Sequence, residues 1–497
     1  MLVEVRPTSR LRGDKPLDIA ASLEPAIHAV CESTLDLSRL RVVCDWVQYR
    51  ANFREVVEVR AVIAATTTAH GVTQAAVPGD QQIEIAVDLR RSSTVSLYEV
   101  MTAAIARHQD LADDDRLFIE PWGPASRSRI WEFNRLYWKA LDLWEAATGQ
   151  MYESALPGGA SDARNADAVS DLIREMFTWW DELEARNALP EELYVVELGV
   201  GNGNQAKTWL DAFLAVEAEQ GRDYYRRLHY LMCDYSPHVL EMARSTVAAH
   251  AQHVSSLVLD ATRPTTALAF LKYKVFLVYI SNFYDNLPTD EVARFDGHSY
   301  VVETRAYLSA VDAAEIAAEH SVQVGALPML IDKLIALGPA LVAEAMPTHF
   351  ADVNDAVDFW RRVWDATRLA ERYAPLPGLD LYEIAPGVTG DLLRPHLESG
   401  GDIRMHVSNG ALASFVDTLP LLHPYGMLVN HDLFVTETTR YRNGFLGPGK
   451  YDGSVVNWIN GPLLAHIGRR MGFDVTFEPF RHRAGTSIVT MTAQVRD

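Results

Sequence analysis

Glycine stands at every second position from Gly199 to Gly203, directly after an apolar run that contains the acid Glu197. The run at 193–198 is predicted to form a buried strand, and the residues at 205–220 are predicted to form a helix. Glycines between a strand and a helix let the backbone turn sharply and approach a ligand, while the helix offers free N–H groups. The segment therefore predicts a ligand-binding turn, although a chance loop before a helix has the same composition.

The spacing of these glycines separates two kinds of nucleotide site. A dinucleotide-binding fingerprint needs its third small residue at position 204, which is Asn204 here. This departure argues against a nicotinamide-dependent oxidoreductase. The observed spacing, after a strand that ends in an acid, is typical of S-adenosylmethionine sites.

Two further acids follow the next two predicted strands. Asp234 follows the strand at 228–233, and Asp260 follows the strand at 255–259. A carboxylate at the end of the second strand can accept hydrogen bonds from both ribose hydroxyls of a nucleoside. Asp260 is the analogous candidate for the adenine amino group. Each acid has a structural alternative, as a turn residue or as a helix cap.

Residues 197–203, 234–244 and 260–261 resemble the motifs of class I S-adenosylmethionine-dependent methyltransferases. More narrowly, residues 281–288 and 451–458 resemble the MidA-like family, which includes mitochondrial complex I assembly methyltransferases that act on protein arginine. The resemblance covers roughly residues 150–497. It implies S-adenosylmethionine as cofactor, bound by Glu197, Gly199, Gly201, Gly203, Asp234, Tyr235, Asp260, Ala261 and Ser281.

Two departures from the narrower family lie where an acceptor would dock. The family's Asn-Glu pair after the fourth strand is Ser281-Asn282, which removes a carboxylate. The family's Asp-Tyr-Gly after the fifth strand is His431-Asp432-Leu433. Protein arginine N-methylation is therefore only an alternative here.

Methyl transfer from a sulfonium is an in-line displacement of an activated group. The protein must align the reactants, exclude water and, for some nucleophiles, remove one proton. Tyr284, Asp285 and Glu303 follow the fourth predicted strand, and His431 follows the fifth, at the edge of the sheet where ligands bind. We expect this group to contact the acceptor, with Asp285, Glu303 or His431 as base, although each residue fits a structural role equally well.

A parallel sheet must position these residues. Strands and helices alternate from 193 to 280, which predicts such a sheet. Helical patterns then fill 305–400, notably 326–345 and 353–373. The alternation returns in helices 409–422 and 458–471 and strands 426–430, 473–478 and 487–494, of which the last two are predicted to form an antiparallel hairpin.

We therefore predict an α/β protein with a Rossmann-like seven-stranded methyltransferase sheet, a helical insertion and an extra N-terminal α/β domain. The predicted units are an N-terminal domain for docking or oligomerisation at 1–125, a helical lead-in at 126–190, the cofactor-binding core at 191–304, an insertion covering the acceptor at 305–400, and the rest of the core at 401–497. Substrate binding is the alternative role for the N-terminal domain.

The composition of the whole chain limits its partners. There are 45 Lys and Arg against 66 Asp and Glu, giving a formal net charge of −21 that disfavours nucleic acid. The 3 cysteines have neither disulfide-framework nor metal-ligand spacing, so we expect no metal. The first residues lack the apolar core of a signal peptide, and no apolar stretch is long enough to cross a membrane, which predicts a cytoplasmic protein.

These observations together predict an enzyme, a methyltransferase acting on a small-molecule or protein side-chain nucleophile, which forms a homodimer through its N-terminal domain. A small-molecule acceptor is preferred, because the departures from the family fall in the acceptor region. The loss of the Asn-Glu pair motivates the main alternative, a non-catalytic S-adenosylmethionine-binding assembly or scaffold protein.

Overall fold

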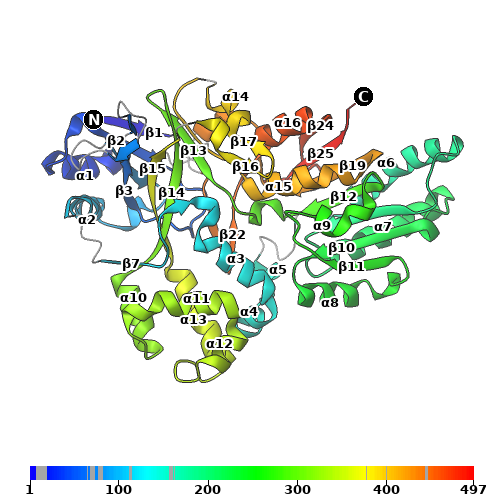
Figure 1. Cartoon of the computed structure of the whole chain (residues 1–497), viewed down its shortest axis with the longest axis horizontal. Helices are drawn as coiled ribbons and strands as arrows, with labels where there is room; N and C mark the ends of the chain where they lie inside the picture. Colours follow the sequence, from blue (N-terminus) through cyan, green and yellow to red (C-terminus); the bar gives the residue numbers. More distant parts are fainter. Residues whose placement is uncertain are drawn as a thin grey trace.

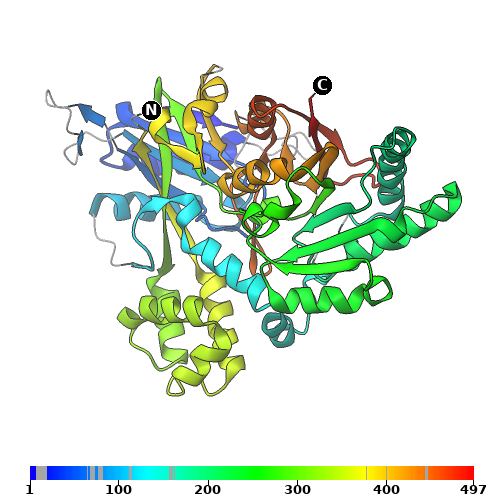
Figure 2. The same cartoon turned by 45° about the vertical axis from the view of Figure 1, so that its right-hand side comes forward.

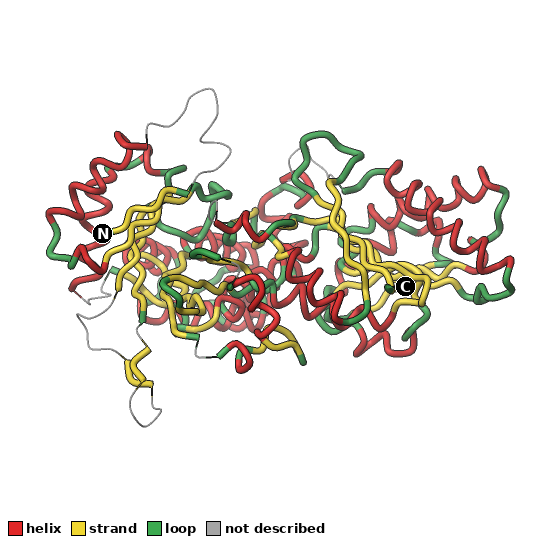
Figure 3. Tube along the Cα trace, turned by 90° about the horizontal axis from the view of Figure 1, so that it is seen from above, coloured by secondary structure: helices red, strands yellow, loops and turns green. Residues whose placement is uncertain are grey.

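A computed structural model describes residues 1–6, 19–63, 65–67, 73–75, 82–110, 115–155, 161, 163–376, 378–398, 400–442 and 446–496. Its strands form two large sheets, which lie in separate lobes (Figure 1). Seen from above, the two groups of strands stand well apart, with helices between and around them (Figure 3).

The sheet that carries the glycine turn has seven strands in the order β11-β10-β9-β12-β19-β25-β24. Their bounds are β9 Leu193–Leu198, β10 Leu228–Asp234, β11 Val254–Val258, β12 Val275–Ser281, β19 Leu422–Asp432, β24 Phe473–Pro479 and β25 Val489–Val495. β25 runs antiparallel to both of its neighbours, β19 and β24, and the other neighbouring strands of this sheet are parallel to each other. The predicted Rossmann-like fold with its terminal hairpin is confirmed.

Helices cover both faces of this sheet, which explains its continuous apolar strands. Their bounds are α6 Ala166–Ala185, α7 Asn204–Gln220, α8 Pro237–Thr246, α15 Asn409–Thr418 and α16 Gly461–Arg470. Alternate residues of β9 point to opposite faces. Val195 packs in the cluster that contains Trp209 of α7, whereas Val196 packs in the cluster that contains Phe415 of α15 and Leu463 of α16. These two cores fix the strands between them, so that the carboxyl ends of the parallel strands lie together at one edge of the sheet.

The second sheet has ten strands and joins distant segments of the chain. Its main order is β1-β2-β6-β3-β15-β14-β13-β18, with β7 and β8 also paired to β14. The bounds are β1 Leu2–Val5, β2 Leu40–Asp45, β3 Val57–Val62, β6 Gln82–Asp88, β7 Arg116–Phe118, β8 Gly123–Pro124, β13 Glu291–Phe295, β14 His298–Ser309, β15 Arg368–Pro375 and β18 Ile403–His406. The strands of the N-terminal range thus share a sheet with strands from 291–406.

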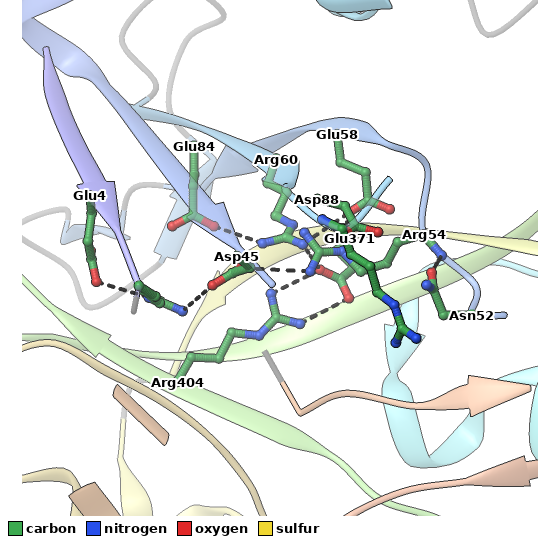
Figure 4. Close-up of polar contacts among 12 residues, drawn as sticks. Glu4, Asp45, Asn52, Arg54, Glu58, Arg60, Glu84, Asp88, Glu371 and Arg404 are labelled. Atoms are coloured by element: carbon green, nitrogen blue, oxygen red, sulfur yellow. Dashed lines mark hydrogen bonds and ion pairs between the residues drawn. The ribbon is translucent and has the colours of Figure 1, made fainter. Parts of the chain in front are cut away.

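The N-terminal strands of this sheet are apolar on one face and charged on the other. Helices α1 (Ile19–Glu32) and α2 (Leu97–Asp110) cover the apolar face, which includes Val42 and Ile85. On the charged face, Arg60 forms ion pairs with Glu84 (2.9 Å) and with Glu371 of β15 (2.8 Å). Figure 4 shows this network, which also includes Arg404 of β18 and is almost entirely buried. Buried ion pairs of this kind connect the N-terminal strands to the later ones.

The range expected to be helical contains both helices and strands. Helices α10 (Ala310–Glu319), α11 (Leu327–Leu337), α12 (Pro339–Ala345) and α13 (Val353–Ala366) form a bundle at the foot of Figure 1. The helix predicted at 353–373 ends at Ala366, because the alternately buried residues of β15 pair with β14 and continue the ten-stranded sheet. Residues 299–304 likewise belong to that sheet, as part of β14. The domain boundaries and the homodimer stay predictions.

Two further helices connect the lobes. α3 (Arg129–Lys139) and α4 (Leu141–Thr148) run between the ten-stranded sheet and the seven-stranded sheet (Figure 2). Their buried face, with Phe133 and Trp144, packs in one core with α10 to α13. None of the helices that the structure describes is long and apolar enough to span a membrane.

Candidate functional site

The glycine turn between β9 and α7 has the backbone geometry that its composition predicts. Gly199, Gly201 and Gly203 have φ angles of 74°, 56° and 81°, which side chains with a Cβ rarely adopt. A Cβ at Gly203 would lie 2.7 Å from the Cα of Ala243 in α8. Gly203 therefore permits the close packing of α7 against α8, while the other two glycines keep the turn narrow.

Asp234 lies at the end of β10, next to this turn. Its Oδ1 accepts a hydrogen bond from the backbone N–H of Ser236 (3.0 Å), and Ser236 in turn caps α8. Burial raises the pKa of Asp234 to about 6, against the opposite effect of backbone N–H groups that include Gly201. The carboxylate is thus held beside the glycine turn and stays ionised at neutral pH.

Glu197 is the second acid at this edge and is only 2% exposed. The hydroxyl of Tyr230 donates a hydrogen bond of 2.6 Å to its Oε2. Burial raises the pKa of Glu197 to about 8, so the carboxyl group holds a proton at neutral pH. A positively charged ligand group nearby would favour ionisation, and S-adenosylmethionine carries an ammonium and a sulfonium group.

A cavity of about 1000 Å³ opens in front of these residues. It is lined by all the predicted cofactor residues except Gly203: Glu197, Gly199, Gly201, Asp234, Tyr235, Asp260, Ala261 and Ser281. Asp260 also forms the expected turn contact, accepting hydrogen bonds from the N–H and hydroxyl of Thr262 (2.9 and 2.7 Å). Since each of these residues lies where the sequence places it, the cavity fits the adenosyl cofactor.

The expected acceptor residues divide in the structure. Only Asp285 lines the cavity. Tyr284 is buried in the apolar core at 1% exposure. Glu303 lies on β14 in the other sheet and forms an ion pair with Arg372 (2.6 Å), so its assignment as a base loses its geometric basis.

His431 also lies outside the cavity lining. Its Nδ1 is 3.0 Å from the hydroxyl of Thr490 on β25, and its ring packs against Tyr279 and Phe480. Burial lowers the pKa of His431 to about 4, so its ring is neutral at physiological pH. The neutral, packed ring suits a structural role.

Asp285 and Asp432 form a buried carboxyl pair at the cavity wall. The Oδ2 of Asp432 accepts hydrogen bonds from the backbone N–H groups of Phe283 (3.1 Å) and Tyr284 (2.8 Å). Burial raises the pKa of Asp432 to about 6, and burial with the nearby charge of Asp432 raises the pKa of Asp285 well above its ordinary value. Asp285 is therefore the more readily protonated carboxyl of the pair, and each carboxyl favours a proton on the other.

Several further residues, which the sequence does not mark as site residues, line the cavity. They include Trp131 and Trp138 of α3. Tyr49, in the N-terminal range, lines it too. Asn134 on α3 is the one local signal, because an amide in an aromatic helix needs partners. It donates to the carbonyl of Asn286 (2.8 Å) and so connects α3 to the cofactor sheet.

The segment predicted to cover the acceptor, residues 305–400, contributes little to the cavity. Of the range 305–400, the lining includes only residues 384–386, and no residue of α10 to α13, all of which the structure describes. Those helices pack against α3 and α4 instead. Among the described residues no group of three or more His, Cys, Asp and Glu is arranged to hold a metal ion.

Part of the chain matches a known protein family. Residues 172–332 match the model of a family described as "Putative S-adenosyl-L-methionine-dependent methyltransferase". A search of curated proteins finds no match.

Similar solved structures include a Burkholderia thailandensis protein described as a "likely methyl transferase", with bound S-adenosyl-homocysteine. It has 14% identity and a TM-score of 0.42, covering 79% of this chain and 91% of that one. An uncharacterized protein from the same organism has 13% identity and a TM-score of 0.40, with the same coverage. The DszA carbon methyltransferase has 13% identity and a TM-score of 0.32, covering 84% of this chain and 74% of that one.

The family match spans β9 to β12 and therefore includes the glycine turn, Asp234 and Asp285. The expected activity and cofactor are thereby confirmed: the chain is an S-adenosylmethionine-dependent methyltransferase and uses S-adenosylmethionine as its cofactor.

Proposed function

We propose that the enzyme methylates a small molecule that enters the cavity beside the cofactor. The supporting observation is the shape of the site. A cavity of about 1000 Å³ is at the upper end of ligand pockets and has room for a cofactor and a second small ligand. Both lobes line it, so the acceptor is enclosed between them. A side chain on the surface of a folded protein would need a more open groove.

The cofactor supplies a methyl group that is already activated on its sulfonium. The glycine turn and Asp234 are placed to hold the adenosyl part, and Glu197 is placed to pair with a positive charge. The aromatic residues of α3 exclude water from the part of the cavity that remains for the acceptor. Alignment of the two ligands is the main contribution of this arrangement.

The carboxyl pair supplies the acid–base chemistry for an acceptor that must lose a proton. Asp285 lines the cavity and Asp432 lies behind it. As Asp285 accepts the acceptor's proton, its own proton can pass to the ionised Asp432, so the pair ends with two protons. Asp432 is a positioning residue in this scheme, because it does not line the cavity.

The test uses tritiated S-adenosylmethionine with separated small-molecule and protein fractions of the producing cells. We expect label to be transferred to the small-molecule fraction. We also expect the Asp285→Asn variant to transfer label at least about 100-fold more slowly, with unchanged affinity for S-adenosyl-homocysteine. Label in protein alone would contradict the proposal. Cofactor binding without transfer to either fraction would support a scaffold protein instead.

A further inference from the structure

Four buried polar atoms in residues that line the cavity make no well-formed hydrogen bond with the described residues. One is the amide Oε1 of Gln205, on α7. The other three are the hydroxyl oxygen of Tyr49, the amide Oδ1 of Asn286 and the indole Nε1 of Trp458. Buried polar groups in native proteins are nearly always paired, and an unpaired group costs free energy. Several such atoms in one largely apolar cavity indicate that a ligand completes them.

These three residues lie around Asp285. Asn286 follows it directly and donates from Nδ2 to its Oδ1 (2.7 Å), which leaves the amide oxygen free. The backbone N–H of Asn457 donates to the carbonyl of Asp285 (3.0 Å), which places Trp458 beside it. Burial raises the pKa of Tyr49, and the charges of Asp285 and Asp432 add to this shift. The Trp458 side chain lies near the Tyr49 hydroxyl and opposes the shift as a hydrogen-bonding group, so these two side chains face one another. The four side chains therefore form one subsite, called the Tyr49 subsite below.

The Tyr49 subsite has a definite hydrogen-bonding pattern. The Trp458 indole can only donate, the Asn286 oxygen can only accept, and the Tyr49 hydroxyl can do both. A ligand hydroxyl has one proton to donate and two lone pairs, so it can satisfy one acceptor and two donors. A neutral primary amine has the reverse balance, with two protons and one lone pair.

The walls next to the Tyr49 subsite are aromatic. Trp131, Tyr137 and Trp138 of α3 line the same cavity, and the rings of Tyr137 and Trp138 meet edge to face at 5.0 Å. Flat aromatic surfaces favour a planar, aromatic ligand, which they can contact by stacking or by their edges.

We propose that the Tyr49 subsite binds the hydroxyl group of an aromatic acceptor, so that the enzyme is an O-methyltransferase for an aromatic hydroxy compound. This inference rests on the proposed function. In the reaction a bond forms between the acceptor oxygen and the methyl carbon as the carbon–sulfur bond breaks. The hydroxyl proton passes to Asp285 as the proton of Asp285 moves to Asp432. The electron pair left on the oxygen by this proton transfer forms the new bond, and the electrons of the broken carbon–sulfur bond leave the sulfur as a neutral thioether. Tyr49 is then a catalytic residue, since it touches the reacting hydroxyl.

The proposal also gives the N-terminal segment a place in the active site. Tyr49 lies in the connection between β2 and β3, the two strands of the N-terminal range that share the ten-stranded sheet with β15 and β18. The ten-stranded sheet thus carries one wall of the acceptor site. This is the substrate-binding alternative for the N-terminal range.

The experiment uses isothermal titration calorimetry to compare three probes of the same shape: 7-hydroxycoumarin, 7-aminocoumarin and unsubstituted coumarin. Each is titrated against the full chain loaded with S-adenosyl-homocysteine. We expect 7-hydroxycoumarin to bind about tenfold more tightly than the other two, from the extra hydrogen bonds. The Tyr49→Phe variant should lose most of this preference. Tyr98→Phe is the matched control, because Tyr98 is exposed on α2, where its hydroxyl donates a hydrogen bond to Glu32 (2.6 Å), and it does not line the cavity.

Equal affinity for the three probes, absence of binding, tightest binding of 7-aminocoumarin, or a preference that survives in Tyr49→Phe would each overturn the inference. The proposed function fails separately, because it requires transfer to the small-molecule fraction whichever probe binds. The affinity of S-adenosyl-homocysteine should be the same in Tyr49→Phe and in wild type. A fall in that affinity would show that Tyr49 serves the cofactor and would also overturn the inference.

Discussion

Replacing Glu197 with glutamine should change the stability of the cofactor-free protein in a pH-dependent way. The carboxyl group is 2% exposed, and burial raises its pKa from 4.5 to about 8. Between these values the native protein holds a proton that the unfolded chain has released. The free energy of unfolding therefore falls by up to about 1.4 kcal/mol for each pH unit in this range. The stabilising contribution is complete below pH 4.5 and is lost by pH 8.

The Glu197→Gln variant has no charge to lose and keeps an oxygen that can accept the hydrogen bond of Tyr230. We expect its unfolding free energy to match that of wild type near pH 4.5. The difference should grow to about 5 kcal/mol in favour of the variant above pH 8, as the upper limit from the pKa shift.

Urea unfolding at pH 5, 7 and 9 measures this difference. Glu192→Gln is the matched control, because Glu192 also accepts a tyrosine hydrogen bond (2.5 Å, from Tyr194) but is exposed. Its effect should stay within about 0.5 kcal/mol at every pH. A Glu197→Gln difference that is independent of pH, or a variant less stable than wild type at pH 9, would refute the reasoning.

Three further variants test individual residues. Gly203→Ala should lower the unfolding free energy by about 2–4 kcal/mol in thermal or urea unfolding, since its Cβ would meet the backbone of Ala243 at a φ of 81°; unchanged stability would contradict the packing account. Glu303→Gln should leave methyl transfer within about twofold and stability within about 1 kcal/mol, and a large loss of transfer would restore it as a base. His431→Gln should leave the pH–rate profile between pH 5.5 and 8 unchanged, because the pKa of His431 is about 4; a lost titration step would show that this ring ionises during turnover.

The cofactor half of the molecule could be predicted because its signals are local. The strands β9, β10 and β11 begin and end within one residue of the predicted ranges. Each is an apolar run bounded by a turn, and the glycines and Asp234 follow from the geometry of that turn. No long-range information was needed to bring these residues together, because the ends of parallel strands meet at one edge.

The other half depends on pairings between distant segments. β3 pairs with β15, more than 300 residues away, and neither range shows this partner in its own pattern. Apolar residues alternate with polar and charged ones in β3 and β6, which is typical of a sheet with one solvent-exposed face. Arg60 and Glu84 are nevertheless buried, because strands from distant parts of the chain cover them. The contribution of Tyr49 to the cavity depends on the same pairings, so no local signal could reveal it.

Calorimetric titration with S-adenosyl-homocysteine tests whether this cavity is the cofactor site. Wild type should bind it. Gly201→Val should lose at least about 100-fold in affinity, because a Cβ at this position would lie 3.0 Å from the Tyr152 hydroxyl, in space that belongs to the cavity. Gly221→Val is the control: it has a similar φ (63° against 56°), ends α7 in open space and should bind like wild type. Absence of binding by wild type, or equal affinity in Gly201→Val, would contradict the assignment of this cavity to the cofactor.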